Sequence, residues 1–128
     1  IQGRWQIIAN NPLTIADVAH NQEGLDYVIP QIKSKSYNKL HLVLGFVNDK
    51  AAEKLLKLFP ENAIFYFAAP KIPRALPIAD LEKVSNKLNL NFKTFSTVAQ
   101  AMSKAQLIAG SDDLIYVGGS TFVVAEIL

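Results

Sequence analysis

Hydrophobic residues along this chain follow two spacings that alternate with one another. Short, nearly continuous apolar runs are typical of strands buried in a parallel sheet. Such runs occupy residues 5–9, 13–17, 40–44, 63–68, 92–95 and 114–117. Between these runs, apolar residues recur at helical spacing. The predicted helices begin after Asn21, occupy residues 51–59, 78–88 and 98–109, and end with one that begins after Ser120. The alternation predicts an α/β fold: a three-layer, Rossmann-like domain with a mostly parallel six-stranded sheet covered on both faces.

Two local features modify this outline. The first two predicted strands are separated only by Asn10-Asn11-Pro12, which is a turn-forming sequence. We therefore expect an antiparallel hairpin, with the first strand at an edge of the sheet. Pro30 lies inside the helix predicted after Asn21. Because proline lacks the backbone N–H, we expect it to kink or split that helix.

The stretch from Leu13 to Gly24 carries the most suggestive polar residues. Asp17, His20 and Asn21 follow the second strand and precede a helix. In open α/β sheets, ligands bind at the carboxyl ends of strands, and a helix start adds free N–H groups that favour anions. Asp17 and His20 are therefore candidates to face a phosphate, a metal-bound nucleotide or a ribose, and we expect both to be exposed and to contribute little to the core.

A purely structural interpretation of the same residues remains open. Asn21 has a side chain suited to capping the helix that it precedes. Asp17 could serve only to tie down a loop, and His20 could be a solvated turn residue. Short polar loops are common, so spacing alone does not separate the two interpretations.

The other loops that follow strands reach the same edge of the predicted sheet. They cover residues 45–50, 69–74 and 118–120, and two of them offer a cation, Lys50 and Arg74. Gly118 and Gly119 allow close backbone approach. Together these loops suit an anionic ligand or a nucleotide. The alternatives are a solvated lysine, an arginine that packs on its proline-rich loop, and glycines that only make a turn.

Composition narrows the class of protein. With 128 residues, half of them hydrophobic, the chain has room for one domain with a substantial core. The net charge is +2 and the lysines are scattered, so no basic tract indicates nucleic acid or membrane binding. Cysteine is absent, which excludes disulfides and thiolate catalysis. His41 lies within the apolar run at residues 40–44 and is expected to be a strand residue and not a metal ligand.

Several motifs of catalytic domains are missing. There is no G-x-x-x-x-G-K-[ST] phosphate loop, no G-x-G-x-x-G after the first strand, and no grouping of serine, histidine and acid. No apolar run reaches the roughly 20 residues of a membrane span, and no signal peptide is visible. The chain begins at Ile1 without methionine, and we expect it to be a piece of a longer protein.

Five short motifs, in order along almost the whole chain, resemble the C-terminal domain of folylpolyglutamate synthase/dihydrofolate synthase, in the Mur ligase superfamily. That family has Gly-Arg before the first strand, Asp-Gly-Ala-His-Asn-Pro, Gly-x-x-x-Asp-Lys-Asp, Pro-Arg-Ala and a closing Gly-Ser-x-Tyr. The corresponding residues here are Gly3-Arg4, Asp17-Val18-Ala19-His20-Asn21, Gly45-Phe46-Val47-Asn48-Asp49-Lys50, Pro73-Arg74-Ala75 and Gly119-Ser120-Thr121-Phe122. Val18 and Gln22 depart from the family's glycine and proline, and Ala51 from its second aspartate.

The resemblance implies an ATP-dependent ligase that uses Mg²⁺ to add L-glutamate to a pteroate, dihydropteroate or folate carboxylate through an acyl phosphate. It implies that Arg4, Asp17 and His20 contact ATP. The phosphate loop and most metal ligands would lie in a preceding domain, so no catalytic or metal-binding residue is assigned to this chain. A cytoplasmic location is expected.

Three weaker candidates also follow from the resemblance. Lys50, Arg74 and Ser120 would lie on the phosphate or glutamate side of the site. Two alternatives to a folate ligase remain: another Mur-superfamily ligase, such as one acting on a cell-wall precursor, and a stand-alone α/β binding module such as a receiver domain. A receiver domain requires an acidic pair after its first strand, and no such pair is present.

Overall fold

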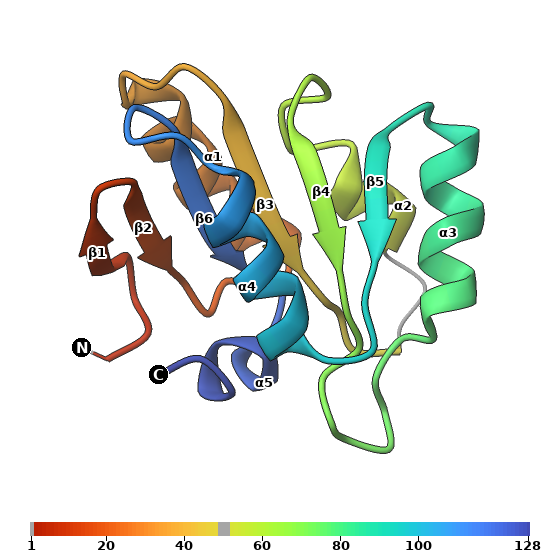
Figure 1. Ribbon diagram of the computed structural model, residues 1–128. Coiled ribbons are helices and arrows are strands. Elements are labelled where there is room, and N and C mark those ends of the chain that lie inside the picture. Colours follow the sequence, from red (N-terminus) through yellow and green to blue (C-terminus); the bar gives the residue numbers. More distant parts are fainter. Residues whose placement is uncertain (1, 49–51) are drawn as a thin grey trace.

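The computed structural model describes residues 2–48 and 52–128, and it confirms the α/β fold predicted from the sequence (Figure 1). Six strands form one sheet in the order β1-β2-β6-β3-β4-β5. The strands are β1 (Gln6–Asn10), β2 (Leu13–Ala16), β3 (Leu40–Leu44), β4 (Ile64–Phe67), β5 (Asn91–Thr94) and β6 (Leu114–Gly118). The helices are α1 (Gln22–Ser34), α2 (Ala52–Leu56), α3 (Ile78–Lys87), α4 (Val98–Ile108) and α5 (Thr121–Ala125).

The sheet is parallel except at one edge. β2, β6, β3, β4 and β5 run in the same direction, and β1 pairs antiparallel with β2 as the predicted hairpin. The last strand of the chain, β6, lies in the middle of the sheet between β2 and β3. All five residues of β3 and all five of β6 are buried, as expected for central strands that are covered on both faces.

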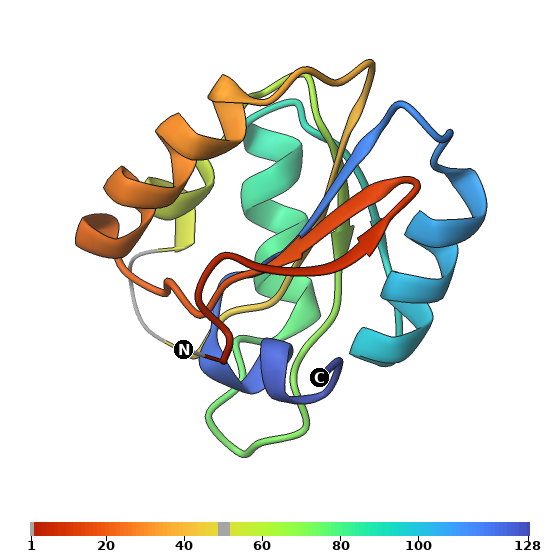
Figure 2. The ribbon, with the colours of Figure 1, turned by 90° about the vertical axis from the view of Figure 1, so that its left-hand side faces the viewer.

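Helices cover both faces of the sheet and bury two separate apolar layers (Figures 1 and 2). The layer on one face joins sheet residues such as Leu42 and Leu44 to buried residues of α1, α2 and α3. The layer on the other face joins Val43 and Val117 to α4 and α5. The alternation of neighbouring strand residues between the two layers follows from the period of two in a strand.

Two helix predictions need correction. α1 is one helix of 13 residues and is not split at Pro30. Proline has no N–H, so the Asp26 carbonyl lacks the helical hydrogen bond that residue 30 would otherwise donate. Asp26 and Pro30 are both exposed, so this carbonyl lies on the solvent side of the helix. α2 is shorter than predicted, because residues 57–59 form a turn after Leu56.

The carboxyl ends of the parallel strands lie together at one end of the sheet, which we call the carboxyl edge. The Asp17 N–H donates to the Val117 carbonyl at 3.0 Å, which ties the loop after β2 to the end of β6. Gly119 has a φ of +94°, and a Cβ there would lie 2.5 Å from the Gly45 carbonyl oxygen. Only glycine fits that position. None of the helices in residues 2–48 and 52–128 is long and apolar enough to span a membrane.

Candidate functional site

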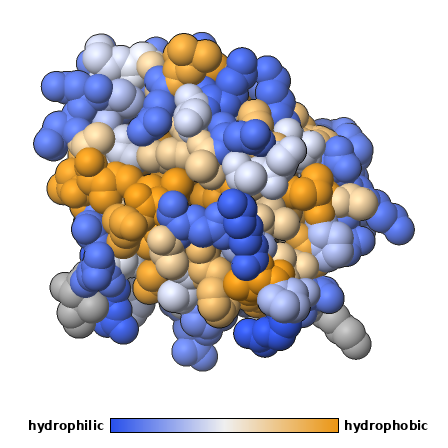
Figure 3. Space-filling model, turned by 60° about the horizontal axis from the view of Figure 1, so that its bottom comes forward, coloured by the Kyte–Doolittle hydropathy of each residue, from blue (hydrophilic) through white to orange (hydrophobic). Residues whose placement is uncertain are grey.

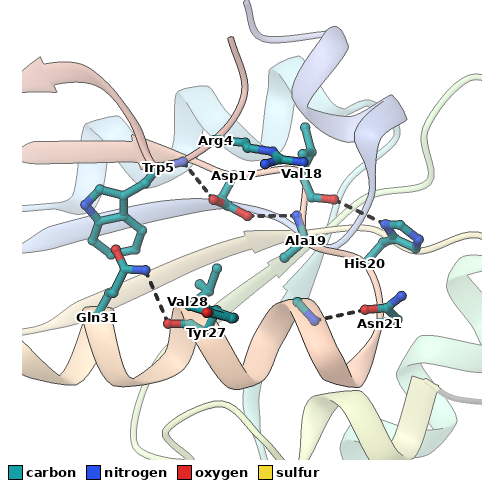
Figure 4. A pocket seen from close by; sticks show the side chains of 11 residues that line it. Arg4, Trp5, Asp17, Val18, Ala19, His20, Asn21, Tyr27, Val28 and Gln31 are labelled. Atoms are coloured by element: carbon teal, nitrogen blue, oxygen red, sulfur yellow. Dashed lines mark hydrogen bonds between the residues drawn. The ribbon is translucent and has the colours of Figure 1, made fainter. Parts of the chain in front are cut away.

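A pocket of about 470 Å³ opens at this carboxyl edge, between the N-terminal segment, the loop after β2 and the start of α1 (Figure 4). Figure 3, in which this edge is brought forward, shows apolar patches lying between hydrophilic side chains. The pocket brings together three residues expected at a ligand site, Arg4, Asp17 and His20. Its other lining residues are Trp5, Val18, Ala19, Asn21, Gly24, Tyr27, Val28 and Gln31.

Asp17 holds the floor of this pocket together. One carboxylate oxygen accepts the Trp5 N–H at 2.7 Å, and the other accepts the Ala19 N–H at 2.8 Å. The residue is only 7% exposed. The expectation that Asp17 is exposed and contributes little to the fold is therefore wrong, because its carboxylate is turned inward to satisfy two backbone donors. Each oxygen still has a second lone pair that can accept a hydrogen bond from a ligand.

The N-terminal segment reaches the pocket through an unusual backbone path. Gly3 has a φ of +81° and Trp5 a φ of +42°. A tryptophan in this region costs roughly 1–2 kcal/mol relative to the right-handed conformation. The Val18 N–H donates to the Gly3 carbonyl at 2.7 Å, and Asp17 accepts from Trp5, so two bonds hold this path in place. The result is an Arg4 side chain that is exposed at the pocket.

His20 lies at the other end of the loop, as Figure 4 shows. It is exposed, and its Nδ1 lies 3.4 Å from the Val18 carbonyl oxygen. This contact leaves Nε2 directed away from the loop carbonyl and free of described protein partners. Arg4 forms no ion pair with any acidic residue in the described part of the chain. The pocket therefore presents the Arg4 guanidinium, which forms no ion pair with a described residue, and the Nε2 atom of His20, which has no described partner.

The start of α1 adds a second source of positive potential. The Asn21 side chain accepts the Gly24 N–H at 2.9 Å, which confirms that Asn21 caps this helix. The cap satisfies one of the free N–H groups of the first turn, and the positive end of the helix dipole lies at the end of the pocket that Asn21 and Gly24 line. An anionic group in the pocket would lie near this helix end as well as near Arg4.

Aromatic side chains at the rim were not anticipated from the sequence. Trp5 is half-buried, and Tyr27 is 79% exposed on α1. Tyr27 lies three residues after Gly24, one turn into the helix, and this spacing is the signal that could have placed it beside the loop. A cation and a helix start beside an aromatic wall fit a nucleotide, whose phosphates are anionic and whose base is flat and apolar.

Two of the weaker candidates, Arg74 and Ser120, are not among the residues that line this pocket. Arg74 is exposed on the loop between β4 and α3, and this loop is fixed by the Leu76 N–H, which donates to the Phe46 carbonyl at 2.8 Å. Ser120 is buried, and its hydroxyl accepts the N–H groups of Phe122 and Val123 at 3.1 Å each, as the cap of α5. Lys50 lies outside the described residues. Ligand contacts of these three residues stay predictions.

Metal-binding side chains do not cluster in the part of the chain that the structure describes. No group of three or more histidine, cysteine, aspartate and glutamate residues there could hold a metal ion. His41 is confirmed as a buried strand residue at the opposite end of the sheet.

Known proteins with similar sequences have folylpolyglutamate synthase in their names. The chain is 32% identical over 130 residues to the dihydrofolate synthase/folylpolyglutamate synthase of Escherichia coli K12, covering 100% of this chain and 30% of that protein. It is 32% identical over 125 residues to a probable bifunctional folylpolyglutamate synthase/dihydropteroate synthase of Haloferax volcanii, covering 97% of this chain and 15% of that protein. The chain thus spans less than a third of the length of these relatives.

Solved structures agree with the sequence relatives. The bifunctional folylpolyglutamate synthase/dihydrofolate synthase of Yersinia pestis, complexed with AMPPNP and Mn ion, superposes with a TM-score of 0.88 at 27% identity, covering 99% of this chain and 30% of that one. E. coli FolC in complex with DHPP and ADP gives a TM-score of 0.87 at 30% identity, with the same coverage. The family model described as "Mur ligase, glutamate ligase domain" matches residues 3–121. This chain belongs to the family of Mur ligase glutamate ligase domains.

Proposed function

We propose that this chain is the C-terminal, nucleotide-facing domain of an ATP-dependent ligase that adds L-glutamate to a pteroate, dihydropteroate or folate carboxylate through an acyl phosphate. The observation that carries the proposal is the pocket that gathers Arg4, Asp17 and His20 at the carboxyl edge. Similar structures, each matched over 99% of this chain, hold ADP and DHPP in one case and Mn, AMPPNP and L-glutamate in another.

The three pocket residues have different tasks in this proposal. The exposed Arg4 guanidinium binds a phosphate oxygen, for which its planar fork of donors is well suited. His20 donates a hydrogen bond from its ring to the same anionic group. Asp17 fixes the segment that carries Arg4 and uses a remaining lone pair for a ribose hydroxyl. ATP supplies the phosphoryl group that activates the carboxylate. Bound Mg²⁺ would neutralise part of the negative charge of the ATP phosphates.

The remaining candidates belong to the phosphate or glutamate side. Arg74 is an exposed cation on a fixed loop of the same edge, and the proposal assigns it, with Lys50 and Ser120, to that side. We assign the phosphate loop and the metal ligands to a preceding domain of the same protein. Closure of the two domains would exclude water, which would otherwise hydrolyse the acyl phosphate. The proposed enzyme is cytoplasmic.

The test is a substrate comparison with the full-length protein that contains this chain. We expect ADP release that requires both L-glutamate and a dihydropteroate or folate acceptor, and a product that is heavier by one glutamate. Turnover only with a nucleotide-linked cell-wall precursor would instead assign the protein to another Mur-superfamily ligase. We expect the 128-residue chain alone to show no turnover. Tight, micromolar ATP binding by that chain alone would favour a self-contained binding module.

A further inference from the structure

The Tyr116 hydroxyl is buried without a hydrogen-bond partner among the described residues. The residue is 0% exposed, and only one other buried side-chain group of the described part, the Ser85 hydroxyl, shares this state. A buried hydroxyl that lacks a partner is costly to the fold, so each such group calls for an explanation. The position of Tyr116 in the sheet supplies one.

The hydroxyl lies at the carboxyl edge, directly beneath the loop that forms the pocket. Tyr116 belongs to β6, and its ring lies against Phe59 on the face covered by α1, α2 and α3, with ring centroids 6.1 Å apart. Its hydroxyl oxygen is 2.8 Å from the point that a Cβ at Gly118 would occupy. Gly118 therefore leaves the space that the Tyr116 hydroxyl needs, since any other side chain would collide with it.

An acceptor that is also unused faces the same space. The main-chain carbonyl oxygen of Asp17 is 2.9 Å from the same Cβ point at Gly118. Within the described residues, no hydrogen bond to this carbonyl is formed, although both carboxylate oxygens and the N–H of Asp17 are bonded. A free donor and a free acceptor thus border one small gap between β6 and the floor of the pocket.

The phenol is a donor at any ordinary pH. Burial raises the pKa of Tyr116 well above its usual value, and the nearby Asp17 carboxylate raises it further. Tyr66 provides a contrast on the opposite face of the sheet. This residue is also buried, but its hydroxyl lies 2.7 Å from Nδ1 of His41, so its hydrogen-bonding requirement is already met.

We propose that Tyr116 is a positioning residue of the nucleotide pocket, whose hydroxyl donates to the Asp17 main-chain carbonyl when an anionic ligand occupies the pocket. This inference rests on the proposed function. A ligand held by Arg4 and His20 draws the Asp17–His20 loop toward one arrangement, and the new hydrogen bond favours that arrangement. The hydrogen bond forms only in the ligand-bound arrangement of the loop, so it makes that arrangement more favourable relative to the ligand-free one. The hydroxyl therefore contributes to ligand binding and not to the stability of the ligand-free fold.

The test uses the full-length protein with ADP as the probe. Tyr116→Phe removes only the hydroxyl, and two variants serve as controls. Ser85→Ala removes the other unpartnered hydroxyl, which lies on α3 away from the pocket. Tyr66→Phe removes a buried hydroxyl that has a partner. Calorimetry gives the dissociation constant of ADP, and melting curves with and without ADP give the stability of each variant.

We expect Tyr116→Phe to melt at or above the wild-type temperature without ADP, because it removes an unpaired polar group. Its dissociation constant for ADP should rise about two- to tenfold, the effect of one hydrogen bond, and ADP should raise its melting temperature less than it does for the wild type. Ser85→Ala should bind ADP as the wild type does, and Tyr66→Phe should lose stability without ADP.

Two results would overturn the inference while leaving the proposed function intact. One is an unchanged dissociation constant for ADP in Tyr116→Phe. The other is a fall in melting temperature without ADP as large as that of Tyr66→Phe, which would show that the hydroxyl is already bonded in the ligand-free protein. Failure of the wild-type protein itself to bind ADP would contradict the proposed function and, with it, this role of Tyr116.

Discussion

The polar groups at the amino end of the sheet differ from those at the carboxyl end in burial and in hydrogen bonding. At the amino end, His41, Tyr66 and Asp113 are buried, and His41 is hydrogen-bonded to both of the others. At the carboxyl end, the Arg4 and His20 side chains are exposed, and the Tyr116 hydroxyl has no partner in the described structure. The amino end uses its polar groups to fix the fold, whereas the carboxyl end keeps several of them available for a ligand.

The amino end is a closed hydrogen-bond network. Nε2 of His41 lies 2.8 Å from one carboxylate oxygen of Asp113, which also accepts the Gly110 N–H at 2.9 Å. The other oxygen accepts the Lys39 N–H at 3.1 Å. With a hydrogen on Nε2, His41 donates to Asp113 and accepts from the Tyr66 hydroxyl, so every group has a partner. The network joins β3, β4 and the segment that leads into β6.

Most positive φ angles of the described residues lie beside the carboxyl edge. They occur there at Gly3, Trp5 and Gly119, whereas Asn89 has the one at the amino end, in the turn between α3 and β5. Such conformations concentrate at functional sites, where the surrounding structure holds them in place. Asp17 supplies that support at Trp5 by accepting its N–H. The comparison predicts that substitutions at the amino end change mainly stability, and that those at the carboxyl end separate stability from binding.

The largest expected effect on stability is at Asp113. Asp113→Ala leaves the His41 ring and two backbone N–H groups buried without an acceptor, and we expect it to lower the free energy of unfolding by about 2–4 kcal/mol. Chemical denaturation measures this. Asp112→Ala is the matched control, because the neighbouring side chain is exposed and should change stability by no more than ~0.5 kcal/mol. Equal effects of the two variants would remove the contrast between the ends.

Asp17→Ala should come next. It leaves the Trp5 and Ala19 N–H groups without their acceptor, and we expect a loss of about 1–3 kcal/mol in the free energy of unfolding. His20→Ala, on the same loop, should change stability by no more than ~0.5 kcal/mol, because that side chain is exposed. Denaturation curves of the two variants measure the difference. A neutral Asp17→Ala would show that the positive φ at Trp5 needs no support.

A smaller effect is expected at the helix cap. Asn21→Ala removes the acceptor for the Gly24 N–H and should cost about 1 kcal/mol. Asn21→Ser restores a capping oxygen and should recover most of that loss. Thermal melts of both variants test this, and a serine variant as unstable as the alanine variant would mean that Asn21 acts through another contact.

The smallest effect is a pH dependence that arises at the amino end. Burial acts to raise the pKa of Asp113, but hydrogen bonds from His41, Gly110 and Lys39 outweigh it and hold that pKa below its usual value. The carboxylate therefore stabilises the fold above the unfolded pKa of about 3.9, and this contribution is lost as the pH falls through the lower folded pKa. Denaturation midpoints from pH 7 down to pH 3 should fall less steeply for Asp113→Asn than for wild type. Parallel curves would contradict the assignment.

Local sequence rules predicted much of this fold. The order of strands and helices follows from apolar spacing, and the capping role of Asn21 follows from its place just before a helix. These features depend on residues close in sequence. Pro30 was misjudged because its cost depends on whether it faces the core or the solvent, which the helix pattern alone does not settle.

Long-range contacts explain what the sequence did not predict. Asp17 is buried because it accepts from Trp5, which the β1–β2 hairpin brings back across 12 residues. His41 and Asp113 are 72 residues apart and meet because β3 pairs with β6. The aromatic rim at Trp5 and Tyr27 joins the N-terminal segment to α1 in the same manner. Each contact depends on how separate segments come together in three dimensions, which a single sequence does not specify.

The central claim is that the carboxyl-edge pocket binds a nucleotide through the side chains that the fold leaves free. The most direct measurement is the ADP dissociation constant of the full-length protein, compared between the wild type and His20→Ala. Loss of one hydrogen bond to a charged group, worth about 1.5–3 kcal/mol, predicts affinity about ten- to a hundredfold weaker, with an unchanged melting temperature in the absence of ADP. Wild-type affinity in His20→Ala, with the domain intact, would contradict the account.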